Sequence, residues 1–432
     1  MNGPEQLLNQ DLLEMQLAEG GLSPSSLPRF LALAGRATQA GFTAADEICV
    51  ASAAGRTELS GNHTDHNLGC VLAASINLDS IALVRPRKDP TVRVLSEGYG
   101  AVEIQSDQLA PQQAEQGTTA ALIRGVLAGF ADRGLRVGGF DAVAGSTVLA
   151  GSGLSSSASF EVLVGVILSH LYNEADVGST VLAQIGQFAE NRYFGKPSGL
   201  MDQVACATGG AVWIDFADRS NPKIERVPVS FEELGYTLCV VDTGGDHADL
   251  TRHYAAIIEE MGAIAGAFGK DSLSEVDQEA VLERVGELRR AHGDRAINRA
   301  LHFFGENRRV GRQLAALRAR DIRTYITLMH ASGTSSARFL QNSAPPESPR
   351  KQAVVTAIAL SEHCFAELGV TPGVDAAARV QGGGFAGTIQ VLLPRPRVDE
   401  YRERMNGWLE KSAVTRLAIR DVGATAFTLK KE

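Results

Sequence analysis

The sequence predicts an α+β protein that folds in two halves, and three observations lead to this prediction. With 432 residues the chain is too long for one simple hydrophobic core, so we expect two domains. Short alternating segments and helical patterns follow one another without an internal repeat. Hydrophobic residues make up 44% of the chain and charged residues 21%, which is ordinary for a soluble globular enzyme.

The expected elements can be given in chain order. Apolar residues at helical spacing predict helices at residues 5–18, 29–41, 118–133, 160–171, 181–193, several up to about 328, and 399–411. Short alternating or apolar runs predict strands at 48–51, 71–76, 80–85, 91–95, 101–104, 140–144, 211–216, 237–242, within 379–394, and at 416–419. A break at 218–228 is the expected junction between the halves, and the prolines of 342–350 indicate a loop.

Composition excludes several classes of partner. The net charge of −9 argues against a nucleic-acid binder, and we interpret the arginine-rich region 284–323 as a solvated helix face. No apolar run is long enough to cross a bilayer, so no membrane association is expected. The N-terminus lacks the pattern of a secretory signal, and the five scattered cysteines form no CxxC pair. We therefore expect a cytoplasmic protein with reduced thiols.

The segment 145–165, GSTVLAGSGLSSSASFEVLVG, predicts a phosphate-binding loop. An apolar run ends at Gly151 and Gly153, three serines follow, and a buried helix begins. Glycines allow backbone N–H groups to surround an anion, and the helix N-terminus adds partial positive charge. The segment lacks the lysine of a Walker A loop, so cations must come from elsewhere. Alone, the same pattern also fits a simple helix cap.

A polar run, GRTELSGNHTDHN at residues 55–67, predicts a sugar site. It places Arg56, Glu58, His63, Asp65 and His66 between two apolar strands. A sugar needs many such hydrogen-bonding partners for its hydroxyls. The alternatives are a metal site at the two histidines and a structural polar turn.

Two acidic residues further along the chain predict a cation site near the phosphate loop. Asp202 lies in the turn 195–203, where a lone Asp would usually be a helix cap, and Glu190 lies on an otherwise apolar helix. A charge on such a helix needs a partner, and beside a phosphate loop that partner would be Mg²⁺.

Three motifs together resemble the GHMP small-molecule kinase superfamily, and within it the galactokinase family. GRTELSGNHTDHN resembles the family signature GRVNLIGEHTDYN, and GSGLSSSAS and QGGGFAG follow it in the family's order. SGLMDQ is similar to the family segment CGIMDQ, and HADLTRHY keeps the spacing of a further family stretch. The resemblance covers about residues 28 to 420.

The resemblance implies both a fold and a reaction. It implies a ribosomal protein S5 domain 2-like N-terminal domain at residues 1–220, with the sugar motif and the phosphate loop. It implies a ferredoxin-like C-terminal domain at 221–432 and an active site between the two domains. The implied reaction transfers phosphate from ATP, with Mg²⁺, to the anomeric C1 hydroxyl of a free sugar, with galactose as the first expectation. A monomer or weak homodimer is expected.

The resemblance also assigns roles to residues. Asp202 would accept or orient the proton of the anomeric hydroxyl, and Arg56 would lie beside that hydroxyl and the phosphate. Mg²⁺ would be held by Ser157 and Glu190. The sugar would be bound by Asn62, His63, Asp65, Gly199 and Tyr254. The ATP phosphates would be held by Gly151, Ser152, Gly153, Leu154, Ser155, Ser156, Ser157 and Ala158.

Departures from the family pattern keep other sugars open. Asn62 and His66 stand where the signature has Glu and Tyr. An amide donates as well as accepts, which suits an acetamido sugar, a uronate or a pentose. A sugar sensor without catalysis on the same fold is a further alternative.

Overall fold

The computed structural model describes residues 7–98, 100–148, 153–196, 198–218, 221–245 and 250–430. The strands are β1 (Cys49–Ser60), β2 (Cys70–Pro86), β3 (Thr91–Ser96), β4 (Gly100–Gln105), β5 (Phe140–Ser146), β6 (Ala211–Asp215), β7 (Lys223–Val227), β8 (Tyr236–Asp242), β9 (Ala377–Val380), β10 (Thr388–Pro394), β11 (Val414–Leu417) and β12 (Ala424–Thr428). The helices are α1 (Gln10–Glu19), α2 (Leu27–Gln39), α3 (Thr119–Ala131), α4 (Ser156–Tyr172), α5 (Ser179–Ala189), α6 (Met201–Thr208), α7 (Thr251–Gly266), α8 (Gln278–Glu283), α9 (Val285–His292), α10 (Asp294–Arg318), α11 (Ile322–Ser335), α12 (Ala353–Glu367) and α13 (Val398–Trp408).

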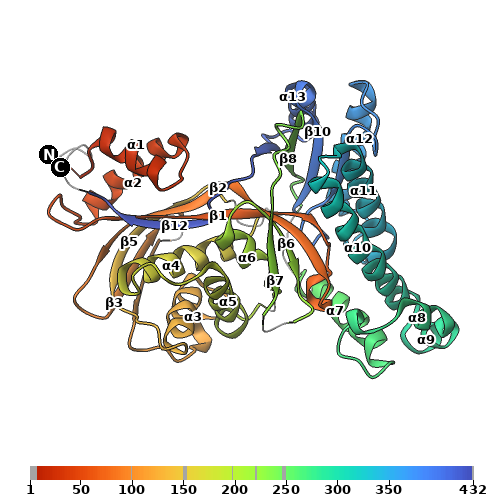
Figure 1. Ribbon diagram of the computed structural model, residues 1–432, viewed down its shortest axis with the longest axis horizontal. Coiled ribbons are helices and arrows are strands. Elements are labelled where there is room, and N and C mark those ends of the chain that lie inside the picture. Colours follow the sequence, from red (N-terminus) through yellow and green to blue (C-terminus); the bar gives the residue numbers. More distant parts are fainter. Residues whose placement is uncertain are drawn as a thin grey trace.

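The larger sheet carries helices on both faces (Figure 1). Within the described residues it has eight strands, in the order β12-β1-β2-β5-β3-β4, with β6 and β7 extending from β2. Alternate residues along β1 point to opposite faces, as a strand requires. Val50 packs in the core under α1 and α2, whereas Ala51 packs in the core under α3, α4 and α5. The two-sided burial explains why the first half of β1, CVASAA, is almost continuously apolar.

The smaller sheet is antiparallel, in the order β11-β8-β10-β9. Helices α12 and α13 cover one face through Phe365 and Tyr401. On the other face a shared core joins the two sheets, because Leu59 and Leu72 of the larger sheet cluster with Leu392 of the smaller one. This core also includes residues of α10 and α11.

Several elements differ from the sequence prediction. The two strands expected at 71–76 and 80–85 are one long strand, β2, and β1 continues through the first half of the polar run. Strand β7 lies in the expected break at 218–228, and α12 and β12 were not expected. The predicted domain boundary falls between β6 and β7, which pair with each other. The division near residue 220 stays a prediction.

The arginine-rich region forms ion pairs rather than an open basic surface. Eight of its arginines pair with acidic residues. In five of these pairs the acidic residue lies outside residues 284–323. Six of these arginines are at least partly exposed, as a solvated helix face requires, whereas Arg299 is buried against Glu260 and Arg309 is mostly buried beside Glu306. The described helices include none with the length and apolar character that a bilayer span requires.

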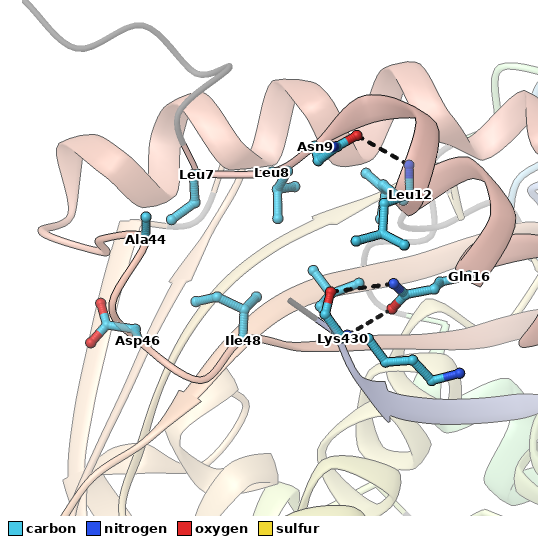
Figure 2. A pocket seen from close by; sticks show the side chains of 11 residues that line it. Leu7, Leu8, Asn9, Leu12, Gln16, Ala44, Asp46, Ile48 and Lys430 are labelled. Carbon is cyan, nitrogen blue, oxygen red and sulfur yellow. Dashed lines mark hydrogen bonds between the residues drawn. The ribbon is translucent and has the colours of Figure 1, made fainter. Parts of the chain in front are cut away.

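A small depression lies where α1 meets the segment that follows β12. It has a volume of about 260 Å³ and is lined mostly by apolar residues, five of which are leucines. Figure 2 shows Gln16 of α1 paired through both ends of its amide with the backbone of Lys430. This contact ties the C-terminal segment to the first helix.

Candidate active site

Strand β1 and the first turn of α6 bring Arg56 and Asp202 together. Arg56 donates from Nε to Asp202 Oδ1 at 2.7 Å and from Nη2 to Oδ2 at 2.8 Å. The Ser155 hydroxyl also donates to Asp202 Oδ2, and Arg56 Nη1 donates to the carbonyl of Gly153. The fork of a guanidinium suits this two-point contact, so the pair has one defined geometry.

Burial and charge compete in setting the protonation of Asp202. Burial alone would raise the pKa of Asp202, but the charge and hydrogen bonds of Arg56 and the hydrogen bond from Ser155 outweigh it. The pKa of Asp202 therefore lies below its ordinary value. The carboxylate is ionised at neutral pH and is a weak base.

The described part of the phosphate loop runs into the N-terminus of α4. Ser155 has a left-handed φ of 59° and does not cap the helix with its side chain, because its hydroxyl is used on Asp202. The first N–H groups of this 17-residue helix thus remain free of a side-chain cap. Such a terminus binds anions. Gly151 and Ser152, which we also expected to hold phosphate, lie outside the described residues.

Ser157 and Glu190 meet beside this helix terminus. The Ser157 hydroxyl donates to Glu190 Oε1 at 2.8 Å, and Lys196 Nζ lies 2.7 Å from the same oxygen. Gln203 donates to the other oxygen, Oε2, at 3.0 Å. The hydroxyl and carboxylate oxygens are the ligand types that Mg²⁺ prefers. The phosphate loop lacks the lysine of a Walker A loop, so its cation was expected from elsewhere in the chain. Lys196 supplies a positive charge near the loop.

A buried carboxyl group lies behind this pair. Gln203 also donates to Glu161 Oε2 at 3.0 Å, so one amide joins Glu161 and Glu190. Burial, followed by the negative charge of Glu190, raises the pKa of Glu161 well above its ordinary value. This shift favours the neutral form of Glu161.

A cavity of about 720 Å³ opens next to Asp202. Four of the residues expected to bind a sugar line it, His63, Asp65, Gly199 and Tyr254, together with Arg56, Glu58 and the described serines of the phosphate loop. A Cβ on Gly199 would lie 1.9 Å from Asp65 Oδ2, so this approach requires glycine. The volume suits a small polar molecule.

The glycine run of the third motif is hydrogen-bonded to Asn62, His63 and Tyr254. The carbonyl of Gly382 accepts from Asn62 at 2.7 Å, that of Gly383 pairs with His63 Nε2 at 2.9 Å, and that of Gly384 accepts from Tyr254 at 3.2 Å. Because a carbonyl only accepts, His63 carries its proton on Nε2. The first and third motifs therefore form one wall of the cavity.

His63 and His66 lie 3.1 Å apart, nitrogen to nitrogen, and His66 Nδ1 lies 3.1 Å from Asp65. Burial, followed by the charge of His66, lowers the pKa of His63 to about 3, so its ring is neutral. No group of three metal-ligating side chains occurs among the described residues. The two histidines form a hydrogen-bonded chain with Asp65.

Asn62 departs from the expected position in the cavity. Its side chain is fully buried behind the cavity wall, where Nδ2 donates to Gly382 and Oδ1 accepts from Ser336 and Asn342. Both ends of the amide are occupied, which leaves no atom for a sugar. The carboxylate of Glu58, paired with Arg379 at 2.7 Å, lines the cavity instead.

Comparisons with known proteins show which family this chain belongs to. Residues 39–86 match the family described as galactokinase galactose-binding signature, and residues 121–210 match the GHMP kinases N terminal domain. Galactokinase of Homo sapiens is 34% identical over 378 residues, which cover 86% of this chain and 90% of that protein. Galactokinase of Streptomyces coelicolor is 33% identical, covering 81% and 85%.

The chain belongs to the galactokinase family. Its fold is similar to that of a Lactococcus lactis galactokinase solved with galactose, with a TM-score of 0.77, 24% identity and coverage of 92% of this chain and 99% of that one. A mevalonate kinase structure gives a TM-score of 0.60 at 14% identity, covering 86% and 99%. The predicted α+β GHMP kinase fold is confirmed.

The sequence alone did not assign a role to three residues that lie at this site. Glu58 stood in the polar run without an assigned role, and Lys196 stood in the turn before Asp202. A lysine beside a predicted anion site was a usable signal for Lys196. Gln381 also lines the cavity, and an isolated glutamine before glycines carries no signal in sequence.

Proposed function

We propose that this member of the galactokinase family transfers the γ-phosphoryl group of ATP to the C1 hydroxyl of galactose. The products are ADP, galactose 1-phosphate and a proton. One observation carries the proposal: Asp202, Arg56 and Ser155 join the phosphate loop to the cavity that holds His63, Asp65 and Tyr254. A phosphoryl donor and a polyhydroxyl acceptor would meet at this junction.

In the proposed mechanism the protein mainly positions the two reactants and neutralises the negative charge of the phosphate. Phosphoryl transfer needs alignment and stabilisation of charge on the transferring group. Arg56 supplies a fixed positive charge beside Asp202, and the N-terminus of α4 supplies backbone donors. Asp202 accepts a hydrogen bond from the C1 hydroxyl and thereby orients it. The hydroxyl proton becomes acidic as the new O–P bond forms and then passes to the carboxylate or to water.

We infer that Ser157 and Glu190 would hold Mg²⁺. Their oxygens converge at 2.8 Å, and an ammonium group already lies on Glu190, so the position favours a cation. Lys196 is half-exposed and can move aside. Bound Mg²⁺ would neutralise negative charge on the ATP phosphates.

The location and assembly of the protein belong to this proposal as well. The five cysteines are free, which supports a reducing compartment such as the cytoplasm. A monomer or weak homodimer stays a prediction.

The test is ADP release from purified protein, ATP and Mg²⁺ with a panel of free sugars. Galactose is expected to give the highest kcat/KM. If kcat/KM is higher with N-acetylgalactosamine, galacturonic acid or arabinose, that sugar is the preferred acceptor and the assignment of galactose is wrong. Sugar binding measured by calorimetry without ADP release from any sugar would overturn catalysis and leave a sugar sensor.

A further inference from the structure

Gln381 is a buried amide with both polar atoms unpaired among the described residues. It follows β9 directly, its side chain is 2% exposed, and neither Oε1 nor Nε2 has a hydrogen-bond partner there. An unpaired buried polar group costs about 1–3 kcal/mol. Other buried side chains in the described part of the chain have an unpaired atom, but Gln381 is the one among them that lines the large cavity.

The backbone around Gln381 fixes where this amide lies. The Gln381 N–H donates to the carbonyl of Thr388 at 3.2 Å, which anchors it at the end of the β9 and β10 pair. Gly153 of the phosphate loop faces the carbonyl and the side chain of Gln381. The amide therefore lies at the border between the phosphate loop and the cavity wall.

The neighbouring polar groups already have partners. Arg379 donates to Glu58, and Asn62 donates to the carbonyl of Gly382, the residue after Gln381. These groups are fixed within the wall, so they do not turn to satisfy the amide. Both amide atoms are covered in the unliganded chain, but the residue lines the cavity, so a partner there is within reach once the side chain turns towards it.

The chemistry of an amide limits what that partner can be. Oε1 needs a donor and Nε2 needs an acceptor. A phosphate group at neutral pH offers acceptors and would leave Oε1 unpaired. A metal ion would pair with Oε1 and leave Nε2 unpaired. Neighbouring hydroxyl groups of a sugar ring offer a donor and an acceptor together.

We propose that Gln381 is a specificity-determining residue that binds hydroxyl groups of the acceptor sugar. The proposal rests on the proposed sugar kinase function and extends it to a residue outside the sugar motif. A buried site that hydrogen-bonds a hydroxyl rejects analogues lacking it. Gln381 would therefore select for a free sugar with adjacent ring hydroxyls.

The experiment measures kcat and both KM values for the wild type and Gln381→Met, which keeps the length of the side chain without its hydrogen bonds. The KM for galactose is expected to rise roughly 10- to 100-fold, with the KM for ATP changed less than about twofold. The 2-, 3-, 4- and 6-deoxygalactoses then locate the contact. At least one should lose affinity in the wild type and show no further loss in Gln381→Met, because the two changes remove the same contact.

A matched control separates binding from structure. Gln16 is also a buried glutamine, but both ends of its amide pair with Lys430 (Figure 2). It lies on α1, which contributes no residue to the lining of the large cavity. Gln16→Met is expected to lower the Tm and to leave both KM values unchanged. Gln381→Met is expected to keep or raise the Tm, since it removes an unpaired amide from the apo protein.

Three results would overturn the proposal. A rise in the KM for ATP alone would assign Gln381 to the nucleotide. Unchanged KM values would remove it from binding, and a fall in Tm as large as that of Gln16→Met would make it structural. If Gln381→Met does not fold, Gln381→Glu keeps the shape and one acceptor and should still raise the KM for galactose. If the wild type releases no ADP, the proposed function fails, and calorimetry with the same variants and sugars still tests Gln381.

Discussion

Both carboxylate oxygens of Asp202 accept hydrogen bonds from side chains, two from Arg56 and one from Ser155. A carboxylate held in this way has a lowered pKa and little tendency to take a proton. The Asp202 carboxylate contributes a fixed orientation and a negative charge. We therefore assign Asp202 to orienting the sugar hydroxyl first and to accepting its proton second.

Replacing Asp202 by Asn tests this assignment. The amide keeps the shape but cannot balance the charge of Arg56, so kcat is expected to fall roughly 10²- to 10³-fold. The KM for galactose should change much less. Steady-state kinetics with circular dichroism for folding measures this. The control, Asp321→Asn at the exposed start of α11, should leave kcat unchanged. An active Asp202→Asn enzyme would contradict the role.

Single residues also mark where sequence reasoning succeeded and failed. Arg56 pairs with Asp202, and Ser157 pairs with Glu190, because the strand and helix ends that carry these motif residues meet in the fold. The site roles themselves stay predictions. Asn62 was expected to face the sugar and is buried, since its partners Ser336 and Asn342 come from parts of the chain far away in sequence. Such long-range partners leave no local pattern.

At the scale of elements, the glycine run after β9 depends on its backbone shape. Gly384 has a φ of 81°, and a Cβ there would lie 2.2 Å from the backbone oxygen of Asn342. Only glycine fits, because both the left-handed conformation and the space exclude a side chain. The loop shape in turn fixes the carbonyls that hold His63 and Tyr254.

Gly384→Ala is therefore expected to destabilise the protein by roughly 3 kcal/mol or more, from strain and overlap together. The KM for galactose should rise as well, because the wall of the cavity shifts. Gly369 is the control, with a φ of 70° and open space around it. Gly369→Ala should cost about 1 kcal/mol and leave the KM unchanged. Urea unfolding and kinetics measure both; equal effects of the two variants would contradict the packing argument.

Helix α10 contributes a buried carboxylate that links stability to pH. Glu306 accepts from Arg309, Ser332 and the Gly61 N–H. Burial alone would raise its pKa, but Arg309, His302, Arg379 and Ser332 lower it to about 2. A lowered pKa gives stability that is present above the ordinary value of 4.5 and is lost as the pH falls towards 2.

Glu306→Gln should remove this pH dependence. The wild type is expected to lose about 3 kcal/mol of unfolding free energy between pH 5 and pH 2 through this group alone. The variant should be less stable at pH 7 and show a smaller loss on acidification. Urea unfolding at a series of pH values measures the difference. Parallel stability curves for the two proteins would show that Glu306 does not titrate in this way.

The missed elements have physical explanations. Strand β12 contains five residues, Ala424–Thr428, and forms because Cys49–Ala53 of β1 offers a free edge. Helix α12 is apolar along most of its length, which obscured its period. The polar first half of the sugar motif belongs to strand β1. Arg56 and Glu58, at alternate positions of this strand, line the cavity, so the strand carries polar residues where an apolar pattern would be expected.

At the scale of the whole molecule, the site depends on the junction of two sheets. Arg56 and Glu58 come from the larger sheet, whereas Gln381 and the glycines come from the loop that joins β9 to β10 of the smaller one. The shared core with Leu59 and Leu392 holds the sheets together beneath the cavity. The galactokinase-family fold was predictable from three ordered motifs, but the shared core that joins the two sheets became visible only in the structure.

The position of the new phosphate tests the central claim most directly. Purified protein is incubated with ATP, Mg²⁺ and galactose, and the product is examined by ¹H–³¹P correlation NMR. Orientation of the anomeric hydroxyl by Asp202 predicts that phosphorus couples to the anomeric proton, which identifies galactose 1-phosphate. Coupling to the C6 protons, or to any other ring position, would contradict the account.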